Sequence, residues 1–195
     1  RKSRQGNYKV ALVGYTNVGK STLMNTLTGA DTLVENKLFA TLDSTVRKIK
    51  KNFPYPVLHS DTVGLINKLP HDLVASFKST LDEVRDADLL IHVVDLSHPE
   101  YRNQMRTTDD LLSQMGMDDI DVLIVFNKID SIGDFDELDK AYEIFPAAVG
   151  ISCKRGDGID ELRKKIVAHY EKKLSPYRLD LKHSQAGLIS QIRKY

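Results

Sequence analysis

The run Gly14-Tyr-Thr-Asn-Val-Gly19-Lys20-Ser21 constrains the fold of this chain more than any other feature. It matches G-x-x-x-x-G-K-[ST], in which glycines let successive backbone N–H groups curl around a polyphosphate. An apolar run at 8–14, interpreted as a strand, precedes the motif, and a helical pattern at 20–27 follows it. Such a helix would point its positive N-terminal end at the phosphates. Both flanks disfavour the alternative, a chance match on a glycine-containing turn.

Strand and helix patterns alternate along the rest of the chain, which is typical of an α/β protein with a mostly parallel sheet. Further strands are expected at 46–50, 56–61, 88–95, 120–127 and 147–152, and further helices at 69–85, 101–115, 134–142 and 159–170. The first of these strands has the weak alternation of an edge strand. We therefore predict a mostly parallel six-stranded sheet with helices on both faces. We expect this domain to span 1–175, because Ser175 and Pro176 break the pattern, and 176–195 to be a C-terminal appendage.

Composition disfavours three classes of protein: strongly basic nucleic-acid-binding proteins, disulfide-bonded proteins and membrane-spanning proteins. The length of 195 residues suffices for one domain with a core, and a formal net charge of +1 provides no overall basic field for nucleic acid. The single cysteine, Cys153, excludes an internal disulfide and suits a reducing compartment. No apolar run approaches the roughly 18 residues of a membrane span. We expect a monomeric, cytoplasmic protein, with partial association with a membrane surface left open.

Asn127-Lys128-Ile129-Asp130 follows a buried apolar run, so it would lie at the carboxyl end of a strand, where open α/β sheets bind ligands. An ionised Asp130 can accept hydrogen bonds from the N1 and N2 donors of guanine together, and adenine offers no such pair. Asn127 would brace the loop and touch the base, and the Lys128 stem would lie over the ring. The motif predicts selectivity for GTP and GDP, and it disfavours an ATPase or a nucleotide kinase.

Ser152-Cys153-Lys154 follows the last expected strand and would close the base site. A backbone N–H of this segment is expected to meet the guanine O6. We interpret Cys153 as a small apolar residue rather than a reactive thiol, because no metal-binding pattern or helix N-terminus accompanies it.

Asp61-Thr62-Val63-Gly64 follows another expected strand and would lie at the terminal phosphate. Asp61 would hold a water of a Mg²⁺ ion, and the Ser21 hydroxyl would ligate the same ion. Gly64 would present its N–H to the γ-phosphate. In the polar stretch 31–45, Thr41 and Thr45 are both candidate Mg²⁺ ligands on chemistry alone, and a plain surface loop is the alternative.

Several separated stretches together resemble the HflX family of ribosome-associated P-loop GTPases. They are 14–22, 38–43, 61–66 and 69–74, followed by the helix pattern 75–85, and the resemblance covers about 10–175. It implies a Ras-like P-loop GTPase fold, a GTP-hydrolysing switch, and binding to the large ribosomal subunit. It also implies that Thr41, not Thr45, is the switch threonine on Mg²⁺, and that 176–195 begin a truncated C-terminal domain.

The predicted site residues follow from these motifs and from the resemblance. The nucleotide is predicted to contact Gly14, Tyr15, Thr16, Asn17, Val18, Gly19, Lys20, Ser21, Thr22, Phe39, Ala40, Thr41, Leu42, Asp43, Asp61, Thr62, Val63, Gly64, Asn127, Lys128, Asp130, Ser152, Cys153 and Lys154. Lys20, Thr41 and Gly64 are predicted to act in catalysis. Ser21, Thr41 and Asp61 are predicted to hold Mg²⁺.

Leu65 stands where many small GTPases have a glutamine that orients the attacking water. We therefore predict slow intrinsic hydrolysis, with the missing group supplied by another segment or by the ribosome. The alternative is a GTP-loaded module that docks on the ribosome with negligible turnover. Asn17 could ligate a K⁺ ion that assists hydrolysis, or it could simply suit a turned backbone.

Histidines and basic clusters carry weaker interpretations. His92 lies inside an expected buried strand and is interpreted as a satisfied core residue, and His71 is either a helix-start residue or a switch group. The clusters 163–165 and 172–173 are interpreted as the solvated face of the last helix, with contact to ribosomal RNA as the alternative. No spacing typical of a zinc site occurs.

Overall fold

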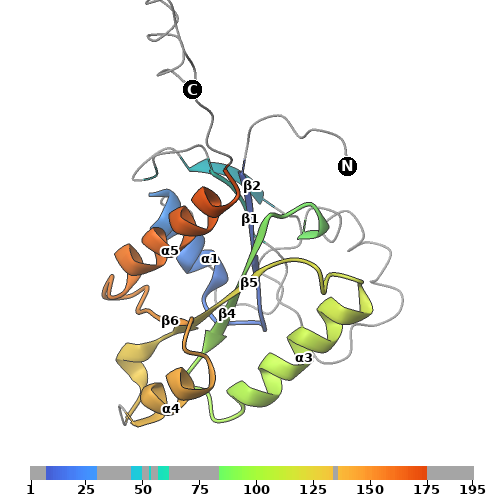
Figure 1. The fold of residues 1–195 in the computed structure, drawn as a ribbon. Helices are drawn as coiled ribbons and strands as arrows, with labels where there is room; N and C mark the ends of the chain where they lie inside the picture. The colour runs from blue at the N-terminus through green and yellow to red at the C-terminus, as the bar shows by residue number, and fades with distance from the viewer. Residues whose placement is uncertain are drawn as a thin grey trace, which may run out of the picture.

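In the described part of the chain, six strands form one sheet in the order β2-β3-β1-β4-β5-β6. Figure 1 shows the helices that lie beside this sheet. The computed structural model describes residues 8–29, 45–49, 53, 57–61, 84–133 and 136–174, with the backbone alone at 45–49 and 57–61. The strands are β1 Tyr8–Val13, β2 Thr45–Ile49, β3 Val57–Asp61, β4 Leu89–Asp95, β5 Val122–Asn127 and β6 Val149–Gly150. Only the edge strand β2 pairs antiparallel, with β3. The prediction of a mostly parallel α/β sheet is thereby confirmed.

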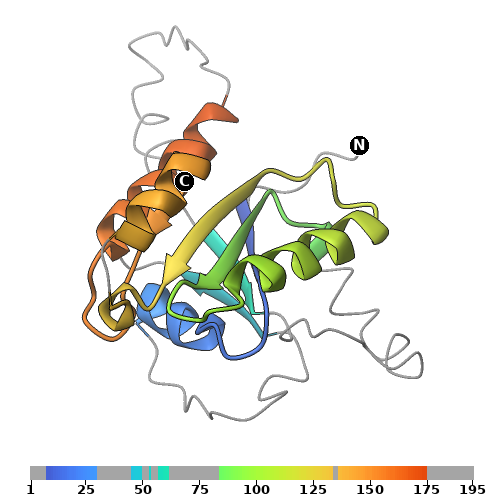
Figure 2. The same ribbon diagram turned by 90° about the horizontal axis from the view of Figure 1, so that it is seen from below.

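Four helices are described: α1 Lys20–Thr28, α3 Tyr101–Gln114, α4 Asp136–Ile144 and α5 Ile159–Lys172. In both views α5 and α3 lie on opposite sides of β5 (Figures 1 and 2). Side chains of α1 and α5 share one core cluster with β1 and β4, and α3 and α4 share another with the ends of β4 and β5. Helices therefore cover both faces of the sheet. No helix in the described part of the chain has both the length and the apolar character needed to cross a bilayer.

The central strand β4 explains why this sheet is buried on both faces. All seven residues of Leu89–Asp95 are buried, which is the near-continuous apolar pattern of a parallel strand covered by helices on each side. Besides Asp95 at its end, His92 is the polar residue within the strand. It is 2% exposed, and its Nδ1 lies 3.3 Å from a carboxylate oxygen of Asp109 on α3. The interpretation of His92 as a satisfied core residue agrees with this contact.

Several described elements begin or end one or two residues from the expected positions, and the last strand is also much shorter than expected. The last strand was expected at 147–152 but spans only Val149–Gly150, because Ser152 leaves the sheet to form an isolated bridge with Asp157. Of the expected helix 69–85, only the helical residues 84 and 85 are described. The expected appendage 176–195 lies outside the described residues.

The interpretation of 163–165 as a solvated face is wrong for two of its three residues. Arg163 is largely buried. Its guanidinium donates to the Thr26 carbonyl at the end of α1 at 3.2 Å and to Asp160 at 2.8 Å. Lys165 donates to the carbonyls of Ala147 and Ala148 at 2.9 and 3.1 Å. Both cations therefore satisfy backbone carbonyls within the domain, and only Lys164 of the three is exposed.

Candidate functional site

The phosphate loop connects β1 to α1 and depends on two glycines at its ends. Gly14 has φ +145° and Gly19 has φ +98°, conformations that residues with a side chain rarely adopt. A Cβ on Gly14 would lie 2.3 Å from the Val93 carbonyl oxygen, and one on Gly19 would lie 2.3 Å from Nδ2 of Asn127. Both positions therefore require glycine for backbone conformation and for close packing.

Lys20 begins α1 and folds back into the loop. Its Nζ donates to the carbonyl oxygens of Gly14 at 3.0 Å and Tyr15 at 2.7 Å, and the residue is 6% exposed. Ser21 follows it in the first turn of the helix, and Thr22 comes next. The ammonium therefore lies inside the curve of the loop, at the positive end of a helix, which is the arrangement that binds anions.

Asn127 joins the phosphate loop to the loops that are predicted to read the base. It ends β5, is 2% exposed, and donates from Nδ2 to the Val18 carbonyl at 2.8 Å. Its Oδ1 accepts a hydrogen bond from the backbone N–H of Cys153 at 3.3 Å. One buried amide thus connects three segments that are far apart in the sequence, and it places the two halves of the predicted site side by side.

The carboxylate of Asp130 lies in the short 3₁₀ turn Ile129–Ser131, which follows β5. Its Oδ1 accepts from the Ser152 hydroxyl at 2.6 Å, and its Oδ2 accepts from the Ser131 hydroxyl at 3.3 Å. Ser152 is fully buried, and its Oγ in turn accepts from the Arg155 N–H at 3.1 Å. The Ser152 hydrogen bond is the largest cause that lowers the pKa of Asp130, so this carboxylate is ionised at neutral pH.

Cys153 and Lys154 complete the loop that faces this turn. Burial is the main cause that raises the pKa of the Cys153 thiol to about 12, with the negative charge of Asp130 as the second cause. A thiol with so high a pKa stays protonated and is a poor nucleophile. The interpretation of Cys153 as a small packing residue agrees with this environment, and the Lys154 side chain is exposed.

Asp95 lies beside Lys128 of the predicted base-reading motif and contacts Ser97, and neither residue was identified from the sequence. Asp95 ends β4, opposite Asn127 in the strand register, and its Oδ2 lies 2.6 Å from the Lys128 Nζ. Its Oδ1 accepts from the N–H and the hydroxyl of Ser97 at 3.1 and 2.6 Å. One signal was available, since Asp95 ends a buried strand at the same edge of the sheet as Asn127.

The switch segments are described only in part. Asp61 is the last residue of β3, paired with Leu12 of β1 and Thr45 of β2, and only its backbone is described. Residues 39–43 and 62–64 lie outside the described residues, as do Leu65 and His71. The predicted roles of these residues therefore stay predictions. Among the residues that the structure describes, no cluster of three His, Cys, Asp or Glu could hold a metal ion.

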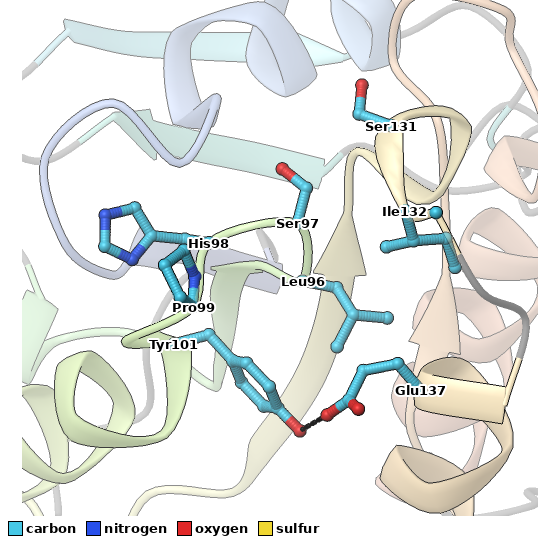
Figure 3. A pocket seen from close by; sticks show the side chains of 9 residues that line it. Leu96, Ser97, His98, Pro99, Tyr101, Ser131, Ile132 and Glu137 are labelled. Atoms are coloured by element: carbon cyan, nitrogen blue, oxygen red, sulfur yellow. Dashed lines mark hydrogen bonds between the residues drawn. The ribbon is translucent and has the colours of Figure 1, made fainter.

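A hollow of about 300 Å³ lies beside the base-reading turn (Figure 3). Ser97 and Ser131 lie along one side of it, and a hydrogen bond from the Tyr101 hydroxyl to Glu137, 2.9 Å long, crosses the other side. None of the nucleotide-contacting residues predicted from the sequence lines it. The hollow is therefore distinct from the predicted nucleotide site.

Comparisons with known proteins agree with this geometry. Residues 9–128 match the family described as "50S ribosome-binding GTPase". The chain is 58% identical over 132 residues to GTPase HflX of Flavobacterium psychrophilum, and this match covers 67% of this chain and 32% of that protein. It is 43% identical over 194 residues to GTPase HflX of Gluconacetobacter diazotrophicus, and this match covers 98% of this chain and 42% of that protein.

A solved structure shares the fold. It is a GTP-binding protein from the archaeon Sulfolobus solfataricus in complex with GDP, with a TM-score of 0.67 and 27% sequence identity. The match covers 85% of this chain and 53% of that one. The chain thus spans about half of the structural relative and about two-fifths, or less, of the curated relatives named above.

Proposed function

The chain belongs to the 50S ribosome-binding GTPase family, among the HflX proteins, and on that premise we propose that it binds GTP and Mg²⁺ and hydrolyses the γ-phosphate. The observation that carries this proposal is the position of Asn127. Its side chain holds the Val18 carbonyl of the phosphate loop and the Cys153 N–H of the base-side loop at once. A phosphate-binding loop and a guanine-reading loop connected in this way can grip the two ends of one nucleotide.

The phosphate end of the proposed site neutralises charge. The glycine-rich loop supplies backbone N–H groups, α1 supplies its positive N-terminal end, and Lys20 supplies a full charge. Phosphoryl transfer depends mainly on positioning and on such electrostatic stabilisation. We therefore assign Lys20 to the β- and γ-phosphates, where it stabilises the charge that develops on the leaving oxygens.

The guanine end reads the base with Asp130. Each carboxylate oxygen already accepts one hydroxyl hydrogen bond and can accept another, so the ionised group can still receive the N1 and N2 donors of guanine. Against adenine this charge would be left without its partner donors, which costs binding energy. We assign the selectivity for guanine to this carboxylate and the contact with O6 to a backbone N–H of 152–154.

Mg²⁺ fits the donor set of this site. Ser21 and Asp61 offer hard oxygen ligands, and they belong to the helix that follows the loop and to the strand beside β1. We propose that Ser21 and Thr41 hold the ion and that Asp61 holds one of its waters. When bound, Mg²⁺ neutralises charge on the β- and γ-phosphates.

Slow intrinsic turnover belongs to the same proposal, because Leu65 cannot orient a water by hydrogen bonding. Asn17 is exposed and has φ 61°, a left-handed conformation for which asparagine is well suited. Its turned backbone is a sufficient reason for the residue, and a K⁺ ligand role is a further proposal for Asn17. Leu65 also favours the second candidate function, a GTP-loaded ribosome-docking module with negligible turnover.

Large-subunit association is proposed from the family description. The test is single-turnover GTP hydrolysis with and without large ribosomal subunits, in K⁺ and in Na⁺, with Lys20→Ala as the blank. We expect slow hydrolysis by the isolated chain, acceleration by the subunits, and further acceleration by Leu65→Gln. Binding without hydrolysis in every condition would favour the docking module. Fast hydrolysis by the isolated chain would contradict the assignment of Leu65, and equal rates in K⁺ and Na⁺ would contradict the K⁺ role.

A further inference from the structure

Asp95 is a nearly buried carboxylate whose two oxygens have separate partners. Its side chain is 11% exposed, and Oδ2 lies 2.6 Å from the Lys128 ammonium. Oδ1 instead accepts the N–H and the hydroxyl of Ser97, which fixes the turn after β4. The adjacent backbone is also tied, since the Leu96 N–H donates to the Asn127 carbonyl at 3.1 Å. The carboxylate is therefore held rigidly beside the base-reading turn, where the proposed function does not use it.

Two carboxylates are candidate partners for the Lys128 ammonium, one close in the sequence and one on the neighbouring strand. Asp130 is two residues further along, and Asp95 is the register partner of the residue before Lys128. Lys128 itself has φ 63°, an uncommon conformation for a residue with a side chain. Its ammonium pairs with Asp95, whereas the Asp130 oxygens accept from the hydroxyls of Ser152 and Ser131. The positive charge is thus kept off the carboxylate that would read guanine.

We propose that Asp95 is a positioning residue for guanine recognition, which holds the Lys128 ammonium so that its alkyl stem is presented to the base and the Asp130 carboxylate stays available. This inference rests on the proposed binding of guanine nucleotides. If Asp95 loses its charge, Lys128 loses its ion-pair partner, and Asp130, two residues further along the chain, is a carboxylate that could take its place. A Lys128–Asp130 pair would compete with the N1 and N2 hydrogens of guanine for the same oxygens.

The test is a double-mutant cycle with Asp95→Asn and Lys128→Met, read by calorimetric titration with GDP and with IDP in Mg²⁺. Asparagine keeps an Oδ1 acceptor for Ser97 and removes only the charge that Lys128 needs. IDP lacks the N2 amino group, so the ratio of GDP to IDP affinity reports the Asp130 fork. Asp95→Asn is expected to weaken GDP binding about tenfold and to lower this ratio about threefold. In the Lys128→Met background Asp95→Asn is expected to change neither quantity.

The matched control is Asp121→Asn, which removes a carboxylate paired with Lys173 at 3.3 Å, outside the proposed site. It makes the same charge change and is expected to leave both affinities unaltered. Equal losses from Asp95→Asn in the two lysine backgrounds would overturn the proposal, because Asp95 would then act on the fold and not through Lys128. An unchanged GDP to IDP ratio would overturn it as well.

Thermal unfolding of each variant accompanies the titrations. If Asp95→Asn does not fold, Asp95→Ser replaces it in the cycle, and failure of both to fold would overturn the proposal. A wild-type chain that gives no heat with GDP would overturn the proposed function and this inference together. Wild-type binding with additive losses would overturn this inference alone.

Discussion

At the scale of single residues, the proposed selectivity rests on the charge of Asp130. Asp130→Asn replaces one acceptor oxygen by an NH₂ group that would face the N2 donor of guanine, whereas xanthine offers a carbonyl there. We expect GDP affinity to fall at least about 100-fold and xanthosine diphosphate to become the better ligand. Calorimetry with both nucleotides measures this.

The control for that substitution is Asp157→Asn, which makes the same charge change at an exposed position of the neighbouring loop. It should leave GDP affinity intact. Full retention of GDP selectivity by Asp130→Asn would show that another group reads the base.

A second residue-scale prediction concerns Gly19 and separates backbone strain from collision. Gly19→Ala places a methyl group 2.3 Å from the Asn127 amide nitrogen at φ +98°, whereas Gly156→Ala places one in open space at φ +85°. The control Gly156→Ala should cost about 1 kcal/mol of unfolding free energy, for conformation alone. Gly19→Ala should cost about 1–3 kcal/mol more, because the Asn127–Val18 hydrogen bond must also shift.

Urea unfolding of the nucleotide-free chain measures both variants. Equal losses of unfolding free energy would mean that Asn127 moves aside without cost and does not hold the phosphate loop.

At the scale of elements, β1 and α5 are joined at the end of the sheet opposite the site. Tyr8 of β1 hydrogen-bonds to His169 of α5 and packs on Tyr170, with ring centroids 4.9 Å apart. His169 in turn lies 3.0 Å from Asp121, which also pairs with Lys173. Residues from a strand, a helix and a loop are thus joined through polar contacts at the rim of the main core.

This junction predicts alkaline sensitivity. Burial, and then the charges of Asp88 and Asp121, raise the pKa of Tyr8 far above its ordinary value near 10. Folding therefore favours the protonated phenol, so its stabilising contribution is complete below about pH 10 and is lost as pH rises toward the folded-state pKa. Above pH 10 the free energy of unfolding should fall more steeply with pH in the wild type than in Tyr8→Phe. The difference between the two slopes should correspond to at most about one proton released on unfolding.

Urea unfolding between pH 8 and 11.5 measures the two slopes. The range from pH 8 to 9 is the internal control, because both proteins should show parallel behaviour there. Parallel slopes above pH 10 would contradict a buried, protonated phenol at this junction.

At the scale of the whole molecule, the carboxyl ends of β1, β4 and β5 meet at one edge of the sheet. Gly14, Asp95 and Asn127 lie at or just after these ends, and Ser152 follows shortly after β6. A ligand that bridges these segments should stabilise the whole domain, because the unfolded chain lacks the site.

GDP with Mg²⁺ at about 100 times its dissociation constant should add about 2.7 kcal/mol to the free energy of unfolding. For a chain of this size the midpoint of thermal unfolding should rise by about 5–10 °C. ATP at the same concentration should give no comparable rise, and neither should GDP with Lys20→Ala. An equal rise of the unfolding midpoint with ATP would contradict the proposed selectivity for guanine.

The sequence determined the local parts of this protein. The phosphate loop, the base-reading motif and the order of strands and helices could be predicted, because each depends on neighbours within a few residues. Periodicity located β4 and β5 to within about two residues. It failed at the last strand, where Ser152 turns away to pair with Asp157, since a short apolar run carries no sign of where pairing stops.

Only the tertiary structure decided which distant side chains meet. Asn127 contacts Val18 across 109 positions of sequence, Arg163 contacts Thr26 across 137, and Asp95 faces Lys128 because β4 and β5 lie in register. The type of each residue determines its charge and its hydrogen-bonding capacity, but strand order and register determine which partner it contacts. A motif can therefore predict that a carboxylate reads guanine, while the fold alone decides which lysine is kept away from it and by which aspartate.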